Sequence, residues 1–179
     1  MQEALAGDRR ALDTLLRRHY PFVYGLCRRM TGNDADAADA AQDALVAIVR
    51  GLARFDGRSR FSTWVYRVAT NVCLDELRRR RRRPEPRDDA LSARPASTTA
   101  LDSSVADRVD VDAALRSLPA DYRAAVVLRD LCGLDYDEIA TVLGIPPGTV
   151  RSRISRGRAA VAERLGNPSR PDRRPTTRS

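Results

Sequence analysis

The residues whose types and spacing best suit a chemical task lie between Pro147 and Leu165. At 100° per residue, apolar side chains gather on one stripe of a helix here: Val150, Ile154, Val161 and Leu165. Other side chains face away from this stripe: Arg151, Ser152, Ser155, Arg156 and Ala159. Small side chains let a backbone approach base edges, and forked guanidiniums suit guanine. Arg153 and Arg158, on the flanks, could reach phosphates.

A helix-turn-helix must position this surface. The sequence predicts a short helix over residues 135–143, a turn at Gly144-Ile145-Pro146 and a longer helix over residues 147–165. A solvated basic face is the plainer interpretation of the arginines taken alone. The preceding turn and short helix favour DNA reading.

Six successive arginines, Arg78 to Arg83, form a second basic feature. They are too many for one helix face, so they must be exposed and must attract polyanions. They could be a nonspecific basic start of a linker or a DNA contact. Both interpretations can hold, since such a cluster adds affinity without sequence information.

Polar and aromatic residues precede this run. The polar ones lie opposite an apolar stripe through Trp64: Arg67, Thr70, Asn71 and Asp75. Asn71 alone is typical of an ordinary surface residue. Aromatic residues flank the loop at 56–60 and could stack on unpaired bases: Phe55, Phe61, Trp64 and Tyr66. Phe61 and Trp64 are better explained as core residues.

Helical periodicity divides the chain in two. It covers residues 11–30, where Pro21 should kink or divide the helix, then residues 34–54 with Asp34 as cap. A third helix, capped by Ser62 or Thr63, runs to the arginines. Residues 84–106 have the composition of a flexible linker, and helices resume near Asp107.

No segment alternates as a strand does, so we predict an all-α fold of two small helical domains. The predicted organisation is a first domain at 1–83, a flexible linker at 84–106, a second domain at 107–166 and a disordered tail at 167–179. Pro119 should lie in the first turn of a helix that Gly133 ends.

Composition agrees with a nucleic-acid partner. The 179 residues are 42% hydrophobic and 31% charged, with a formal net charge of +8 and no lysine. Arginine suits phosphate and guanine better than lysine does. Codon bias in a GC-rich genome is an equally good origin of the all-arginine composition.

Several classes of protein are disfavoured. There is no run of about 18 apolar residues and no signal-peptide core, so a cytoplasmic protein is expected. Cys27, Cys73 and Cys132 lie far apart and His19 is the single histidine, so no metal site and no cofactor are expected. The sequence also offers no set of residues typical of an enzyme active site. We predict core positions for Cys27 and Cys73, and the greatest reactivity for Cys132.

Two blocks carry a family resemblance. These are QDALVAIVRGLARFDGRSRFSTWVYRVATNVCLDELRRRRRR and, after the linker, LPADYRAAVVLRDLCGLDYDEIATVLGIPPGTVRSRISRGRAAV. Together they resemble the extracytoplasmic-function (ECF) class of bacterial RNA polymerase sigma factors over about residues 8–165. The first block looks like sigma region 2 and the second like region 4. The resemblance implies a polymerase subunit, not an enzyme.

The resemblance also implies roles for residues of the first block. Core polymerase binding, on the clamp coiled coil of the largest subunit, would involve Gln42, Asp43, Val46, Val49 and Arg50. The family usually has glutamate where Asp43 stands. Phe55, Phe61 and Asn71 would capture a base flipped from the minus-ten element. The DNA backbone there would be held by Arg67 and by the arginine run, including Arg78, Arg79 and Arg80.

The second block would read the minus-thirty-five element. Its residues nearest the bases would be Arg151, Ser152, Ser155 and Arg156, with Arg129, Thr149 and Arg153 near phosphates. Many relatives carry a larger residue where Ser155 stands. The implied partners are core RNA polymerase, through clamp and flap region, promoter DNA and an anti-sigma factor. The alternative is a two-domain helix-turn-helix regulator that acts without core polymerase.

Overall fold

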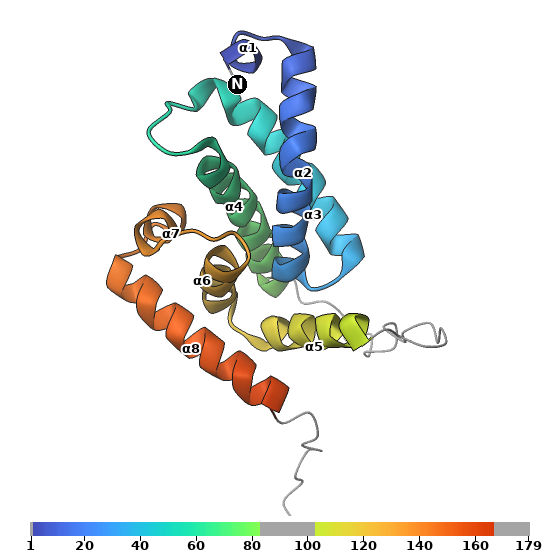
Figure 1. The fold of residues 1–179 in the computed structure, drawn as a ribbon, viewed down its shortest axis with the longest axis vertical. Helices are drawn as coiled ribbons and strands as arrows, with labels where there is room; N and C mark the ends of the chain where they lie inside the picture. The colour runs from blue at the N-terminus through green and yellow to red at the C-terminus, as the bar shows by residue number, and fades with distance from the viewer. Residues whose placement is uncertain (1, 83–102, 167–179) are drawn as a thin grey trace, which may run out of the picture.

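Every element that the structure describes is helical. The computed structural model describes residues 2–82 and 103–166 (Figure 1). In chain order its elements are α1 (Gln2–Leu5), α2 (Arg9–Thr31), α3 (Asp34–Gly51), the 3-10 turn η1 (Leu52–Arg54), α4 (Phe61–Arg82), α5 (Ser103–Ser117), α6 (Ala120–Asp130), α7 (Tyr136–Leu143) and α8 (Pro147–Gly166). The all-α prediction is confirmed for these ranges. Most of the expected linker and the whole expected tail lie outside them.

The long helix α2 runs through Pro21 without a break. The prediction allowed Pro21 either to kink the helix or to divide it, and the division is not observed. Pro21 is exposed, whereas Val23 and Leu26 just beyond it are fully buried. Packing of these residues therefore outweighs the one hydrogen bond that proline removes. The helix ends at Gly32, whose left-handed backbone (φ 88°) glycine adopts without strain.

Two predicted helix starts differ from the observed ones. Asn33, not Asp34, caps α3, and its side chain accepts the Asp36 amide at 2.9 Å. Helix α4 begins at Phe61, which places Thr63 inside the first turn. The Thr63 hydroxyl is buried there and donates to another helix, so it does not serve as a cap.

Helices α2, α3 and α4 form a three-helix bundle around one core (Figure 1). Fully buried alanines on α3, among them Ala41 and Ala44, let the helices approach closely. Cys27 and Cys73 are both fully buried in this core, with their sulfurs 3.6 Å apart. Their predicted core positions are confirmed.

Helices α5 to α8 form the second unit. Helix α7 ends at Gly144 (φ 64°), and α8 follows after a short turn, so the predicted helix-turn-helix is confirmed. Helix α5 begins at Ser103, inside the segment expected to be linker. Pro119 is the N-cap residue of α6 and thus lies one position outside its first turn.

The two units pack against each other. Helices α2 and α4 contact α5, α6 and α7 (Figure 1). The Arg123 guanidinium of α6 is buried and donates to the Met30 carbonyl at the end of α2. Asp112 of α5 pairs with Arg28, at 3.1 Å, and with Arg29. The sequence did not predict this interface.

No helix in the described ranges combines the length and the apolar character needed to cross a bilayer.

Candidate nucleic-acid interface

Helix α8 presents the predicted base-reading surface to solvent. Val150 and Ile154 are buried against the rest of the second unit. The predicted base-contacting residues are all exposed: Arg151, Ser152, Ser155 and Arg156. Leu165, predicted for the buried stripe, is exposed because α8 projects there beyond its packing partners (Figure 1).

A close helix crossing holds α8 in place. Gly157 is buried, and a Cβ at this position would lie 2.6 Å from the Val126 side chain of α6. Only glycine therefore permits this approach. Small residues and arginines alternate around position 157 in the sequence. This pattern did not indicate that Gly157 packs against another helix.

The arginines around α8 fall into two groups. Arg153 pairs with Asp121 at 3.2 Å, and Arg158 pairs with Asp130, so acidic residues of α6 hold both. Arg129 and Arg151 instead lie over the ring of Tyr136, with 5.0 and 5.4 Å from Cζ to ring centroid. Tyr136 was not among the residues predicted from the sequence. Thr149, the remaining predicted phosphate contact, is half-buried at the start of α8.

A second candidate surface lies at the start of α4. Phe55, Phe61 and Trp64 form an aromatic cluster with centroid distances of 5.4 to 5.5 Å. Trp64 is buried, as predicted, whereas Phe55 and Phe61 are half-buried beside the 56–60 loop. Partly exposed aromatic rings next to a loop are suited to stacking on an unpaired base.

The polar face of α4 is narrower than predicted. Arg67 and Asn71 are exposed, one turn apart on the same face. Thr70, which the sequence analysis placed with them, is fully buried. The reason is the helical period, which places Thr70 on the side of α4 that also carries Ala69 and Cys73. This side of the helix packs in the core.

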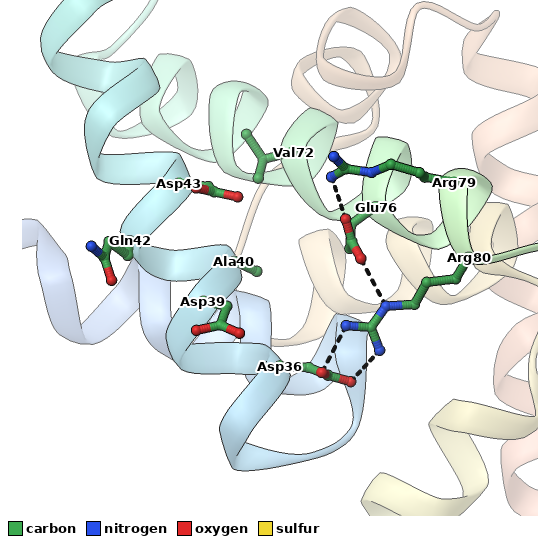
Figure 2. Close-up of a pocket in the computed structure, with 9 residues that line it drawn as sticks. All are labelled: Asp36, Asp39, Ala40, Gln42, Asp43, Val72, Glu76, Arg79 and Arg80. Atoms are coloured by element: carbon green, nitrogen blue, oxygen red, sulfur yellow. Dashed lines mark hydrogen bonds and ion pairs between the residues drawn. The ribbon is translucent and has the colours of Figure 1, made fainter. Parts of the chain in front are cut away.

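The arginine run continues α4 instead of starting a linker. Arg78 pairs with Asp75 at 3.2 Å, and Arg79 pairs with Glu76. Arg80 bonds both Asp36 of α3, at 2.7 Å, and Glu76, at 2.8 Å (Figure 2). Bonding by Arg80 holds the pKa of the Asp36 carboxyl below its usual range.

Arg81 and Arg82 complete the described part of the run, and Arg83 lies outside it. Both are exposed, and neither pairs with an acidic residue among the side chains that the structure describes, those of residues 3–82 and 110–166. Position along the run therefore separates arginines with acidic partners, of which Arg80 ties α4 to α3, from arginines that face solvent.

An acidic and apolar face covers the outer side of α3. A groove of about 420 Å³ lies between α3 and α4 (Figure 2), lined by Asp36, Asp39, Ala40, Gln42, Asp43, Val72, Glu76, Arg79 and Arg80. Further along α3, Val46 and Val49 are each 42% exposed. Arg50 is exposed beside them. Large exposed apolar residues next to charged ones are typical of a protein-binding surface.

Cys132 is a poor nucleophile in this fold. It is partly buried, and burial raises the pKa of its thiol to about 12. Because the thiolate is the reactive form, this works against the reactivity expected for Cys132.

The polar residues that join the two units were not predicted from the sequence. Arg123 lies in an otherwise apolar stretch of α6, which is the one signal that could have marked it. Burial lowers the pKa of its guanidinium, yet three backbone carbonyls accept its hydrogen bonds. Glu138 accepts a hydrogen bond from Thr63 at 3.0 Å and also completes the capping box of α7.

Comparison with known proteins gives the family. The sequence matches the models for sigma-70 region 2 over residues 15–83 and sigma-70 region 4 over residues 108–161. It is 40% identical over 163 residues to the ECF RNA polymerase sigma factor SigM of Mycobacterium tuberculosis, covering 90% of this chain and 81% of that protein. It is 35% identical over 170 residues to the ECF RNA polymerase sigma-E factor of Escherichia coli K12, covering 89% and 88%.

Solved structures share the fold. A sigma factor RpoE from Bartonella quintana, solved with the anti-sigma factor NepR, matches with a TM-score of 0.70 at 24% identity, covering 87% of this chain and 96% of that chain. CnrH, solved with the cytosolic domain of CnrY, matches with a TM-score of 0.69 at 26% identity, covering 94% and 96%.

A helical region 2 and a helix-turn-helix region 4 on one chain define a sigma factor of the sigma-70 family. Within it, the chain belongs to the ECF RNA polymerase sigma factors. It is an alternative sigma factor that directs transcription initiation with core RNA polymerase. The alternative of a regulator that acts without the polymerase is not favoured.

Proposed function

We propose that three surfaces of this sigma factor share the work of promoter recognition in the cytoplasm. The outer face of α3 binds core polymerase, the start of α4 captures the minus-ten element, and α8 reads the minus-thirty-five element. The observation that carries the proposal is the exposure of four clustered residues on a tightly packed helix: Arg151, Ser152, Ser155 and Arg156.

Helix α3 supplies the polymerase contact. Val46 and Val49 offer apolar area, and Gln42, Asp43 and Arg50 surround them with polar groups. Such a surface fits a helical partner with apolar and basic side chains. The clamp coiled coil of the largest polymerase subunit is the partner that the family resemblance implies.

The second unit offers a contact for the flap region. A groove of about 240 Å³ between α5, α6 and α8, bordered by Arg29 of α2, is lined mainly by apolar residues: Val111, Leu115, Val126, Val127, Leu131 and Val161. A groove of this kind accepts the apolar face of a helix. We assign it to the flap region of the polymerase.

Minus-ten recognition rests on Asn71 with Phe55 and Phe61. A base that leaves the stack costs a few kcal/mol, which stacking on a ring and hydrogen bonding to an amide can offset. Arg67 is exposed one turn from Asn71 and can hold the strand's phosphates. Arg78, Arg79 and Arg80 can join it only by exchanging their acidic partners for phosphate.

Region 4 completes the contact with promoter DNA at the minus-thirty-five element. Arg151, Ser152, Ser155 and Arg156 face the base edges of the major groove, while Arg129, Thr149 and Arg153 lie near phosphates.

We also propose that an anti-sigma factor regulates the protein. Two structural neighbours were solved with a second protein, one of them named as an anti-sigma factor.

A pull-down with sigma-free core polymerase tests the α3 assignment. The wild-type chain should bind tightly, and Val46→Asp should weaken binding at least tenfold because it places a charge in an apolar contact. Ala160→Asp, on the exposed side of α8 and away from α3, is the matched control and should bind as the wild type does. Equal binding by both variants would contradict the assignment.

A further inference from the structure

Tyr136 gathers two cations from two other helices. It is the first residue of α7, directly after the capping-box residue Asp135. Arg129 comes from the end of α6 and Arg151 from the first turns of α8. Their guanidinium carbons lie 5.0 and 5.4 Å from the centroid of the one ring. Both distances are within the range of a cation–π contact.

This arrangement keeps both charges available. Arg153 and Arg158, on the same helix as Arg151, are held by the carboxylates of Asp121 and Asp130. A carboxylate neutralises a guanidinium and occupies its N–H donors. An aromatic ring contacts the guanidinium plane, so the charge and most of the edge donors remain free for another partner.

Arg129 is held from a second side. Its Nη1 donates to the Leu134 carbonyl at 2.7 Å in the loop before α7. The capping box, formed by Asp135 and Glu138, fixes the start of α7 and with it the place of the ring. Two long side chains that would otherwise sample many rotamers are therefore ordered before any ligand binds.

We propose that Tyr136 is a positioning residue for minus-thirty-five recognition. Its ring holds Arg129 and Arg151 next to each other at the amino-terminal end of the reading helix. There Arg129 contacts a phosphate and Arg151 reaches the neighbouring base step. This inference rests on the proposed role of α8, and it adds a residue that does not itself contact a base.

The experiment uses holoenzyme assembled from the full chain and core polymerase. The DNA probe is the promoter-length duplex that wild-type holoenzyme enriches from a randomised pool. Tyr136→Leu should weaken binding to this duplex about 5- to 30-fold, the effect of losing two exposed cation–π contacts. Tyr136→Phe keeps the ring and should bind within about twofold of wild type.

A double-mutant cycle separates positioning from a structural role. In a chain that carries Arg129→Ala and Arg151→Ala, Tyr136→Leu should cost no more than about twofold, because the ring then has nothing to hold. A structural role would give the full loss in this background as well, and would overturn the proposal.

A fluorinated phenylalanine at position 136 serves if the leucine variant does not fold. It keeps the shape of the ring and removes negative charge from its face, so binding should weaken although the melting temperature does not change. Unchanged binding would overturn the proposal for Tyr136 alone. Failure of wild-type holoenzyme to enrich any minus-thirty-five sequence would overturn the proposed role of α8 as well.

Discussion

Single side chains on α8 differ in what they can contribute to DNA binding. Arg156 is exposed on the predicted base-reading face, whereas Arg158 is held by Asp130. Only the first has a guanidinium available for a forked contact to guanine. The sequence predicted this face from periodicity, but it could not tell which arginines have acidic partners, because Asp130 lies 28 residues away.

Arg156→Ala should weaken minus-thirty-five binding by about 1–3 kcal/mol and relax base preference at one position. Competition binding by holoenzyme on cognate duplexes with single base changes measures both effects. Arg158→Ala is the matched control and should leave base preference unchanged. An equal loss on every sequence would show that Arg156 contacts a phosphate instead.

Asn71→Ala should impair open-complex formation while core binding and minus-thirty-five binding stay intact. The reason is that the amide acts only after a base has left the stack. Transcription from templates with a pre-melted minus-ten bubble provides the measurement. Wild-type protein should depend on the identity of the captured base and the variant should depend on it less. If both show the same preference, Asn71 does not contact the base.

Whole elements were more predictable than their ends. Apolar periodicity located the main helices of the described ranges because burial of one face drives their formation. The start of α3 was displaced by one residue because Asn33 and Asp34 are both good caps and only geometry selects between them. The bond between Arg80 and Asp36 could not be predicted, because nothing in a run of six arginines shows that Asp36 lies opposite, 44 residues earlier.

Two parts of the arginine run should have different roles, one in stability and the other in phosphate binding. Arg80→Gln removes the bonds to Asp36 and Glu76, so it should lower stability by up to about 1 kcal/mol with little change in the salt dependence of promoter binding. The double variant Arg81→Gln, Arg82→Gln should do the reverse and flatten the salt slope by about 0.7–0.9 per lost phosphate contact. Urea unfolding and affinity against log salt measure the two effects. A flattened slope for Arg80→Gln alone would contradict this division.

At the scale of the whole molecule, the two DNA-reading units lie against each other (Figure 1). Arg123, Asp112 and Glu138 supply the polar contacts between them. The sequence could not predict this packing, since each contact joins residues 75 or more positions apart. Promoter elements about 25 base pairs apart span roughly 85 Å of duplex, whereas a compact fold of this length has a radius of gyration of only about 15 Å.

The two units should therefore separate in the promoter complex. Spin labels on the exposed residues Ala38 of α3 and Ala160 of α8 would report their distance. The distance should increase by tens of ångströms between the free chain and holoenzyme on promoter DNA. An unchanged distance in that complex would contradict simultaneous reading of both elements.

Transcription by reconstituted holoenzyme is the direct test of whether this chain acts as a sigma factor. Sigma-free core polymerase, the purified chain and the duplex enriched by their complex would be combined, and the transcripts mapped at their 5′ ends. We predict one discrete start that requires both the chain and the core polymerase and is lost on a scrambled promoter. Specific DNA binding by the chain alone, with no start-site-specific transcript when core polymerase is present, would contradict the account.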